Sequence, residues 1–104
     1  MTPREMKVII TEAAYADLRH IGMEIKKNSP SRAGTFVAEL YDRCQRLGAM
    51  PLAFPLLPNW EERGVRRRVF RNYLIFYRVG NDAIEVLHIL HGATVYERVL
   101  FPDD

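Results

Sequence analysis

Arginine provides the strongest chemical signal in the sequence. Twelve of the fifteen basic residues are arginines, and six of them lie between Arg63 and Asn81, a stretch without any acidic residue. This stretch carries a charge of +6 and the remainder −4, which together give the net charge of +2. Guanidinium groups form planar, bidentate contacts with phosphates and carboxylates. The pattern therefore predicts an acidic or phosphate-bearing partner.

Three of these arginines are consecutive, at Arg66, Arg67 and Arg68, in a segment expected to form a strand. Because successive side chains of a strand point to opposite faces, Arg66 and Arg68 should share one face and Arg67 should lie on the other. One interpretation is a solvated edge strand that its charges protect from aggregation, and the other is a surface that binds a partner. Arg71 and Arg78, in the same acid-free stretch, favour binding.

The residues commonly used in catalysis are poorly arranged for it. His88 and His91 are three residues apart in an expected strand and should project to opposite faces, and His20 lies in a distant helix. This spacing does not predict a metal site. Ser29 and Ser31 are the only serines, and both fall at an expected helix start. The sequence therefore lacks the motif of a serine nucleophile.

The single cysteine, Cys44, falls on an apolar helical stripe and is expected to be a buried structural thiol. A lone cysteine cannot form an intramolecular disulfide, which suits a reducing cytoplasm. The sequence has no Gly-x-Gly-x-x-Gly or Walker-type loop and no apolar run of membrane-spanning length. We therefore expect a cytoplasmic protein that uses no cofactor, metal or membrane.

A metal-free ribonuclease is the one catalytic alternative that these residues support. Such an enzyme needs a base for the 2′-hydroxyl, cations for the phosphorane and an acid for the leaving oxygen. His91 or Tyr96 could be the base, and His88 the acid. Arg78 and Arg98 could supply the cations.

Two helices are predicted in the first half of the chain. A short strand at residues 7–10 leads to Thr11, a suitable N-cap for a helix over residues 12–27. Ser29 and Pro30 predict the start of a second helix, which Gly48 ends. The apolar stripes of the two helices are Ala14, Leu18, Ile21 and Ile25 in the first and Ala33, Phe36, Val37, Leu40, Cys44 and Leu47 in the second.

The second half of the chain predicts an irregular connection followed by strands. Residues 50–64 contain three prolines among apolar residues that could fix the loop in place. Strands are expected at residues 65–70, 73–79 and 83–91, joined by hairpin turns. The middle strand is apolar on both faces and should be central. Alternation in the last strand groups Ile84, Val86, His88 and Leu90 on one face and Glu85, Leu87, Ile89 and His91 on the other.

The tail, residues 93–104, fits either a final strand or a docked segment. The whole chain, residues 1–104, is long enough for one domain. The element order β-α-α-β-β-β predicts an α+β fold in which a helical hairpin packs on one face of a small antiparallel sheet.

Residues 64–79 carry a family resemblance, in the sequence Gly-Val-Arg-Arg-Arg-Val-Phe-Arg-Asn-Tyr-Leu-Ile-Phe-Tyr-Arg-Val. This segment resembles the ParE branch of the RelE/ParE toxin superfamily, as does the His91-Gly92-Ala93 motif after the last expected strand. Ala16-Asp17-Leu18 and Phe54-Pro55 are also similar, and the likeness spans residues 6–101.

The resemblance implies the toxin of a type II toxin–antitoxin system, which binds and poisons DNA gyrase and is not an enzyme. RelE-like relatives cut messenger RNA on the ribosome, and this activity is the alternative. RelE-like ribonucleases carry arginines at the positions of Leu74 and Thr94, and their absence disfavours cleavage. ParE-like sequences also commonly have arginine at Thr94, so a degenerate interaction module of the same fold is a further alternative.

The expected partners are gyrase and a cognate antitoxin, ParD-like or other, which forms a hetero-oligomer with the chain. The antitoxin's acidic C-terminal segment should fold over the helical hairpin and a sheet edge. Whether the chain also binds nucleic acid directly stays open. The candidate target contacts are Arg66, Arg68, Arg71, Arg78, Tyr96, Arg98 and Phe101, and the candidate antitoxin contacts are Leu18, Ile21, Phe36, Leu40, Trp60 and Arg67.

Overall fold

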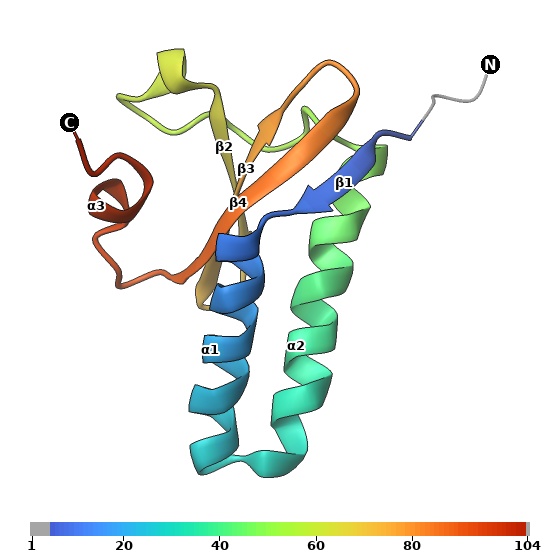
Figure 1. Ribbon diagram of the computed structural model, residues 1–104, viewed down its shortest axis with the longest axis vertical. Helices are drawn as coiled ribbons and strands as arrows, with labels where there is room; N and C mark the ends of the chain where they lie inside the picture. Colours follow the sequence, from blue (N-terminus) through green and yellow to red (C-terminus); the bar gives the residue numbers. More distant parts are fainter. Residues whose placement is uncertain (1–4, 104) are drawn as a thin grey trace.

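The computed structural model describes residues 5–103, in which a helical hairpin packs on one face of a four-stranded sheet (Figure 1). The elements are β1 (Lys7–Ile10), α1 (Glu12–Asn28), α2 (Pro30–Gln45), η1 (Arg46–Ala49), η2 (Glu61–Arg63), β2 (Val65–Phe70), β3 (Tyr73–Val79), β4 (Ala83–His91) and α3 (Tyr96–Leu100). The predicted order β-α-α-β-β-β and the α+β class are confirmed. The tail adds a short helix, α3, and forms no strand within the described residues.

The sheet has the order β1-β4-β3-β2, and its last three strands form the predicted antiparallel meander. Strand β1 pairs with β4 in parallel, so the prediction of a fully antiparallel sheet is wrong. A hairpin turn forces its two strands to be antiparallel, whereas β1 is joined to the rest of the sheet through two helices. The direction of β1 is therefore free of that constraint.

The predicted alternation along β4 is also wrong, because the β3–β4 register shifts between Phe76 and Tyr77. Phe76 pairs with His88 and Tyr77 with Val86, which leaves Leu87 without a partner. A bulge of this kind changes the phase of the side chains. As a result, the buried core beneath the helices includes Ile89 together with Ile84 and Val86, instead of Leu90.

Two hydrophobic clusters lie on opposite faces of the sheet. The cluster beneath the helices consists of Ala14, Leu18, Ile21, Phe36, Leu40, Cys44, Leu47, Ile75, Tyr77, Ile84, Val86 and Ile89. The second cluster consists of Leu57, Val65, Phe76 and Phe101. Strand β3 contributes to both clusters, which confirms that it is the central strand covered on each face.

The helix boundaries follow their predicted caps in part. The hydroxyl of Thr11 accepts from the backbone N–H of Ala14 at 3.2 Å, as expected of an N-cap. Ser29 makes no side-chain capping bond, so Pro30 alone marks the start of α2 as predicted. Gly48 is buried within η1, beyond the end of α2, and a Cβ there would overlap the carbonyl oxygen of Met6. Close approach to β1, and not helix termination, therefore requires this glycine.

The proline-rich connection follows the outer edge of β2. The N–H of Leu57 donates to the carbonyl of Val65 at 2.9 Å, and the N–H of Arg67 donates to the carbonyl of Pro55 at 3.0 Å. These bonds cover the first half of an edge that would otherwise be open. In the described part of the chain, no helix is long and apolar enough to span a membrane.

Candidate functional site

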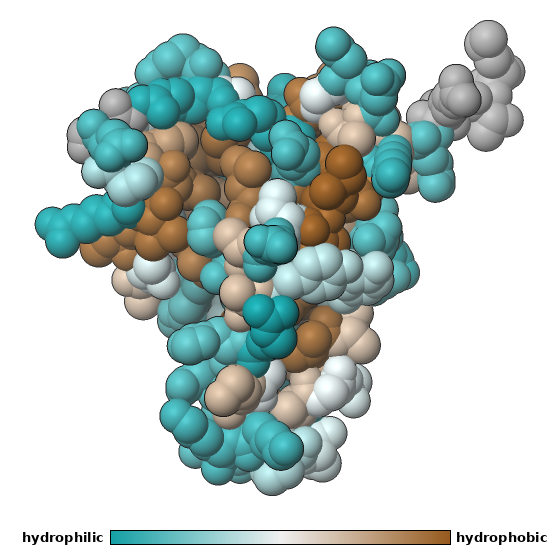
Figure 2. Space-filling view, viewed as in Figure 1, coloured by the Kyte–Doolittle hydropathy of each residue, from teal (hydrophilic) through white to brown (hydrophobic). Residues whose placement is uncertain are grey.

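The outer surface where α1 and α2 meet forms an apolar groove of about 750 Å³, here called the hairpin groove. Its lining residues are Tyr15, Leu18, Arg19, Gly22, Met23, Lys26, Ala33, Gly34, Val37, Ala38 and Tyr41. In Figure 2, pale and brown side chains lie between hydrophilic ones along the two helices. The two helices approach closely at Gly22, where a Cβ would lie 3.1 Å from Val37 Cγ2.

Charged and aromatic groups border the hairpin groove. Arg19 and Lys26 lie along α1, while Tyr15 and Tyr41 come from different helices and are both exposed. Desolvation and the neighbouring hydroxyl of Tyr41 raise the pKa of Tyr15. An apolar floor with basic residues beside it fits an amphipathic segment that carries acidic residues. It provides no group arranged for bond cleavage.

The predicted antitoxin contacts on the helices are mostly unavailable at the surface. Ile21, Phe36 and Leu40 are buried in the core beneath the helices, and only Leu18 of this set reaches the hairpin groove, as part of its floor. These four residues belong to the main apolar stripes of α1 and α2, and those helix faces pack against the sheet. The groove instead uses a second stripe at helical spacing, which includes Tyr15 and Met23 and was a weaker signal because arginine and lysine interrupt it.

The arginines of β2 divide between the two faces of the sheet, as alternation predicts. On the helix side, Arg66 Nη1 donates to the carbonyl of Phe54 at 2.7 Å, and Arg68 Nη1 donates to the carbonyl of Arg43 at 3.2 Å. On the opposite side, Arg67 Nη1 lies 3.4 Å from the hydroxyl of Tyr96. These three cations bond to uncharged groups, so the contacts hold their side chains without neutralising them.

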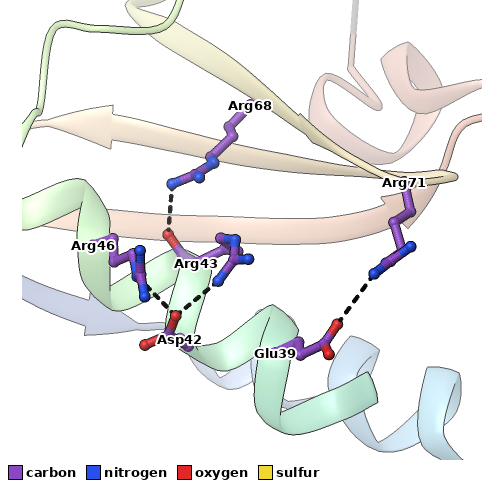
Figure 3. A network of polar contacts seen from close by, with 6 residues as sticks. All are labelled: Glu39, Asp42, Arg43, Arg46, Arg68 and Arg71. Carbon is purple, nitrogen blue, oxygen red and sulfur yellow. Dashed lines mark hydrogen bonds and ion pairs between the residues drawn. The ribbon is translucent and has the colours of Figure 1, made fainter. Parts of the chain in front are cut away.

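The two remaining arginines of the acid-free stretch lie in different places. Arg71 is in the β2–β3 turn with a φ of 53°, and its Nη2 is 3.8 Å from Glu39 Oε2 (Figure 3). Arg78 is exposed on β3, where its Nε donates to the carbonyl of Arg63 at 3.3 Å. The predicted target contacts therefore do not form one patch: Arg66, Arg68 and Arg71 lie on the helix side, and Arg78 lies elsewhere.

The tail is docked on the face of the sheet opposite the helices. Phe101 is 6% exposed and stacks on Trp60, with ring centroids 4.4 Å apart. Tyr96 packs on Phe76 at 5.1 Å, and Arg98 is exposed beside the Trp60–Phe101 stack. Phe101, a predicted target contact, is buried here, and Trp60, a predicted antitoxin contact, is partly buried against the second cluster.

The candidate ribonuclease residues are not brought together. Arg78 is five residues from Tyr73 along β3, a distance of about 17 Å in a strand. His91 pairs with Tyr73, and their rings meet edge to face at 5.4 Å. His88 Nδ1 instead lies 2.8 Å from Asp17 Oδ2. Arg78 is therefore far from His91, although His88 contacts Asp17 on the same side of the sheet as α1.

A small polar pocket between the middle of α1 and the end of β4 was missed by sequence reasoning. His20, although distant in the sequence, lines this pocket of about 400 Å³ together with His91, Asp17, Glu24 and Thr94. The carboxylate of Asp17 is already engaged, because Oδ2 also accepts from the backbone N–H of Ile89 at 2.8 Å. Across residues 5–103, no group of three potential ligands is placed to hold a metal ion.

Cys44 is a buried free thiol, as predicted. Burial raises its pKa to about 12, and the nearby Arg68 opposes that shift. A thiol with so high a pKa is protonated at neutral pH and is a poor nucleophile. Cys44 is therefore part of the core beneath the helices and not of a reactive site.

Comparison with known proteins places these features in context. The model of the family described as "ParE toxin of type II toxin-antitoxin system, parDE" matches residues 8–96. A solved chain from the chromosomal ParDE system of P. aeruginosa is 23% identical and has a TM-score of 0.73, covering 84% of this chain and 96% of its own. A chain from the RelBE2 toxin–antitoxin complex of Mycobacterium tuberculosis is 21% identical and has a TM-score of 0.62, covering 88% and 95%. No curated protein sequence was found to match.

Proposed function

The chain belongs to the ParE toxin family of type II toxin–antitoxin systems, and on that basis we propose that it acts by binding DNA gyrase and is neutralised by an antitoxin seated in the hairpin groove. The observation that carries this proposal is the family match over residues 8–96, combined with an apolar groove that the fold leaves uncovered. Both solved relatives come from toxin–antitoxin systems, which supports an antitoxin as the partner.

The chemistry of the hairpin groove supports an acidic, amphipathic helix as its occupant. Met23 and the two tyrosines offer apolar area to such a helix, and Arg19 and Lys26 lie where acidic residues on its polar side could pair with them. An antitoxin segment that folds on binding would bury this area while it orders. Because these charge pairs would lie at an exposed surface, we expect the affinity of the complex to fall as the salt concentration rises.

A pair of matched variants tests this docking. Met23, 64% exposed, lines the groove, and Leu52, 67% exposed, lies outside it. We expect Met23→Asp to weaken binding of the cognate antitoxin by about tenfold or more, because a carboxylate would be buried against apolar side chains. Leu52→Asp should leave the affinity unchanged in isothermal titration calorimetry. Equal losses in both variants, or no loss in Met23→Asp, would contradict docking in the groove.

The absence of cationic residues that a RelE-like ribonuclease uses supports action by binding to gyrase over cleavage of RNA. Leu74 and Thr94 replace two arginines that the RelE-like pattern places there, and Arg78 lies far from His91. Removing two cations from a site that stabilises a doubly charged phosphorane would cost several kcal/mol of transition-state stabilisation, about 3 kcal/mol for each donor lost.

Two assays on the purified chain distinguish the activities. We expect loss of DNA supercoiling by gyrase, with accumulation of gyrase–DNA cleavage complexes, at concentrations that leave ribosome-bound messenger RNA intact. Adding the antitoxin should restore supercoiling. Cleavage of the message at codon boundaries would instead identify a ribonuclease, and activity in neither assay would identify a degenerate interaction module.

A further inference from the structure

Four arginines from separate parts of the chain form a cationic surface beside α2, here called the arginine strip. Arg43 comes from the end of α2, Arg46 from the start of η1, Arg68 from β2 and Arg71 from the β2–β3 turn (Figure 3). The sequence separates the two pairs by more than twenty residues, and packing of α2 along β2 brings them together.

The arginine strip holds more positive charge than its acidic neighbours balance. Arg43 Nη1 and Arg46 Nε both bond to a single oxygen, Oδ2 of Asp42, at 2.8 Å. Arg68 donates to a carbonyl, and Arg71 approaches Glu39 only to 3.8 Å. Four guanidinium groups thus face two carboxylates. Burial is the largest cause of the lowered pKa of Arg68, and the charges of Arg43 and Arg46 lower that pKa further. An added anion would offset the second, electrostatic contribution.

Aromatic rings position these guanidinium groups in advance. Arg43 and Arg71 lie over the ring of Phe70, at 5.0 and 5.4 Å from its centroid, and Arg68 lies over Phe54 at 4.8 Å. Cation–π contacts hold the groups in place but use none of their N–H donors. The side chains of Arg46 and Arg71 are 60% and 61% exposed, so donors at both ends of the strip are accessible.

A small polar pocket of about 290 Å³ continues the arginine strip towards the start of α2. Its lining residues are Ser31, Arg32, Thr35, Phe36, Glu39 and Arg71, so two guanidinium groups and two hydroxyls share it with one carboxylate. Hydroxyl and guanidinium donors of this kind typically contact phosphate oxygens in protein–nucleic acid interfaces. The hairpin groove differs, because its floor is apolar and suits a folded peptide.

We propose that the arginine strip binds the phosphodiester backbone of nucleic acid. This interaction is separate from the antitoxin groove and goes beyond the proposed action on gyrase, because it requires neither protein. A backbone contact supplies affinity without sequence preference and falls steeply with added salt, since each neutralised phosphate releases counterions.

Fluorescence anisotropy with labelled mixed-sequence probes, duplex DNA and single-stranded RNA, tests the proposal on the full chain. The variant Arg43→Gln/Arg46→Gln should weaken binding by about tenfold or more and lower the slope of log affinity against log salt by about two, one for each lost phosphate contact. The matched control, Arg19→Gln/Lys26→Gln, removes the same charge from the hairpin groove and should leave the slope unchanged. The probe that binds more tightly identifies the nucleic acid.

The variant Asp42→Asn is expected to gain affinity, a result that a misfolded protein would not give. It removes the carboxylate that competes for Arg43 and Arg46, and we expect it to bind the preferred probe about threefold more tightly or better. Unchanged affinity in Asp42→Asn, or equal effects of the two double variants, would overturn the proposal. So would equally tight binding of a glutamate-rich peptide matched to the probe in charge, which would identify the strip as a protein-binding surface.

Discussion

At the scale of single residues, Asp17 connects elements that lie far apart in the sequence. Its Oδ2 accepts from the backbone N–H of Ile89 and lies 2.8 Å from His88 Nδ1, so one carboxylate ties α1 to the bulged part of β4. In the sequence, Asp17 stood out only as part of the Ala16-Asp17-Leu18 similarity, and its contact with β4 could not be predicted. The bulge that offers the N–H of Ile89 arises only when β3 and β4 pair.

Cys44 gives a residue-scale prediction about pH. Burial raises the pKa of its thiol from 9.0 to about 12. The folded chain therefore keeps a proton that the unfolded chain releases above pH 9, so the contribution of Cys44 to stability is complete below that pH and declines as the pH rises. Between pH 8 and 10 we expect this group to remove about 1 kcal/mol from the free energy of unfolding.

Urea denaturation of the wild type and of Cys44→Ala at both pH values measures this effect. The variant is less stable at pH 8 because it contains a cavity, but its stability should fall less by pH 10. Since Tyr77 titrates in both proteins, its raised pKa cancels in the comparison. Identical losses in the two proteins would show that the Cys44 thiol is not protected.

At the scale of elements, the contact between η1 and β1 depends on Gly48. The N–H of Met6 donates to the carbonyl of Gly48 at 2.9 Å, and an added Cβ would overlap the Met6 carbonyl oxygen. We expect Gly48→Ala to lower the free energy of unfolding by about 2 kcal/mol, because η1 must move away from β1.

Gly34 offers the matched control within α2. A Cβ there meets no atom within 4 Å, so Gly34→Ala should stabilise the helix by up to about 1 kcal/mol. Thermal and urea denaturation of both variants gives the comparison. If Gly48→Ala is as stable as Gly34→Ala, the close approach of the Met6 backbone does not explain why glycine occupies position 48.

At the scale of the whole molecule, the tail and the proline-rich connection close the face of the sheet that the helices leave open. Trp60 and Phe101 stack across this face, and Leu57 and Val65 lie in the cluster beneath them. The sequence of the middle strand, residues 73–79, predicted a second core because it is apolar on both faces. Which segments would cover it could not be predicted, since the tail fitted either a strand or a docked segment.

The stacking leads to a prediction about the docked tail. Phe101→Ala should lower the free energy of unfolding by about 3 kcal/mol and shift the fluorescence of the single tryptophan, Trp60, to the red as water reaches it. Val99→Ala, a control at an exposed tail position, should change stability by less than about 1 kcal/mol. An unshifted emission spectrum in Phe101→Ala would mean that the tail does not protect Trp60.

The sequence by itself determined the order of the two long helices and four strands, the faces of Arg66, Arg67 and Arg68, the burial of Cys44 and the family. These depend on local periodicity and on motifs that neighbouring residues carry. Only the tertiary structure decided that β1 is parallel to β4, that Leu87 is bulged, that Phe36 and Leu40 are buried in the core, and that Arg43 and Arg46 join Arg68. Each of these depends on which distant segments meet, and that is set by how the helices pack across the sheet, which no local pattern encodes.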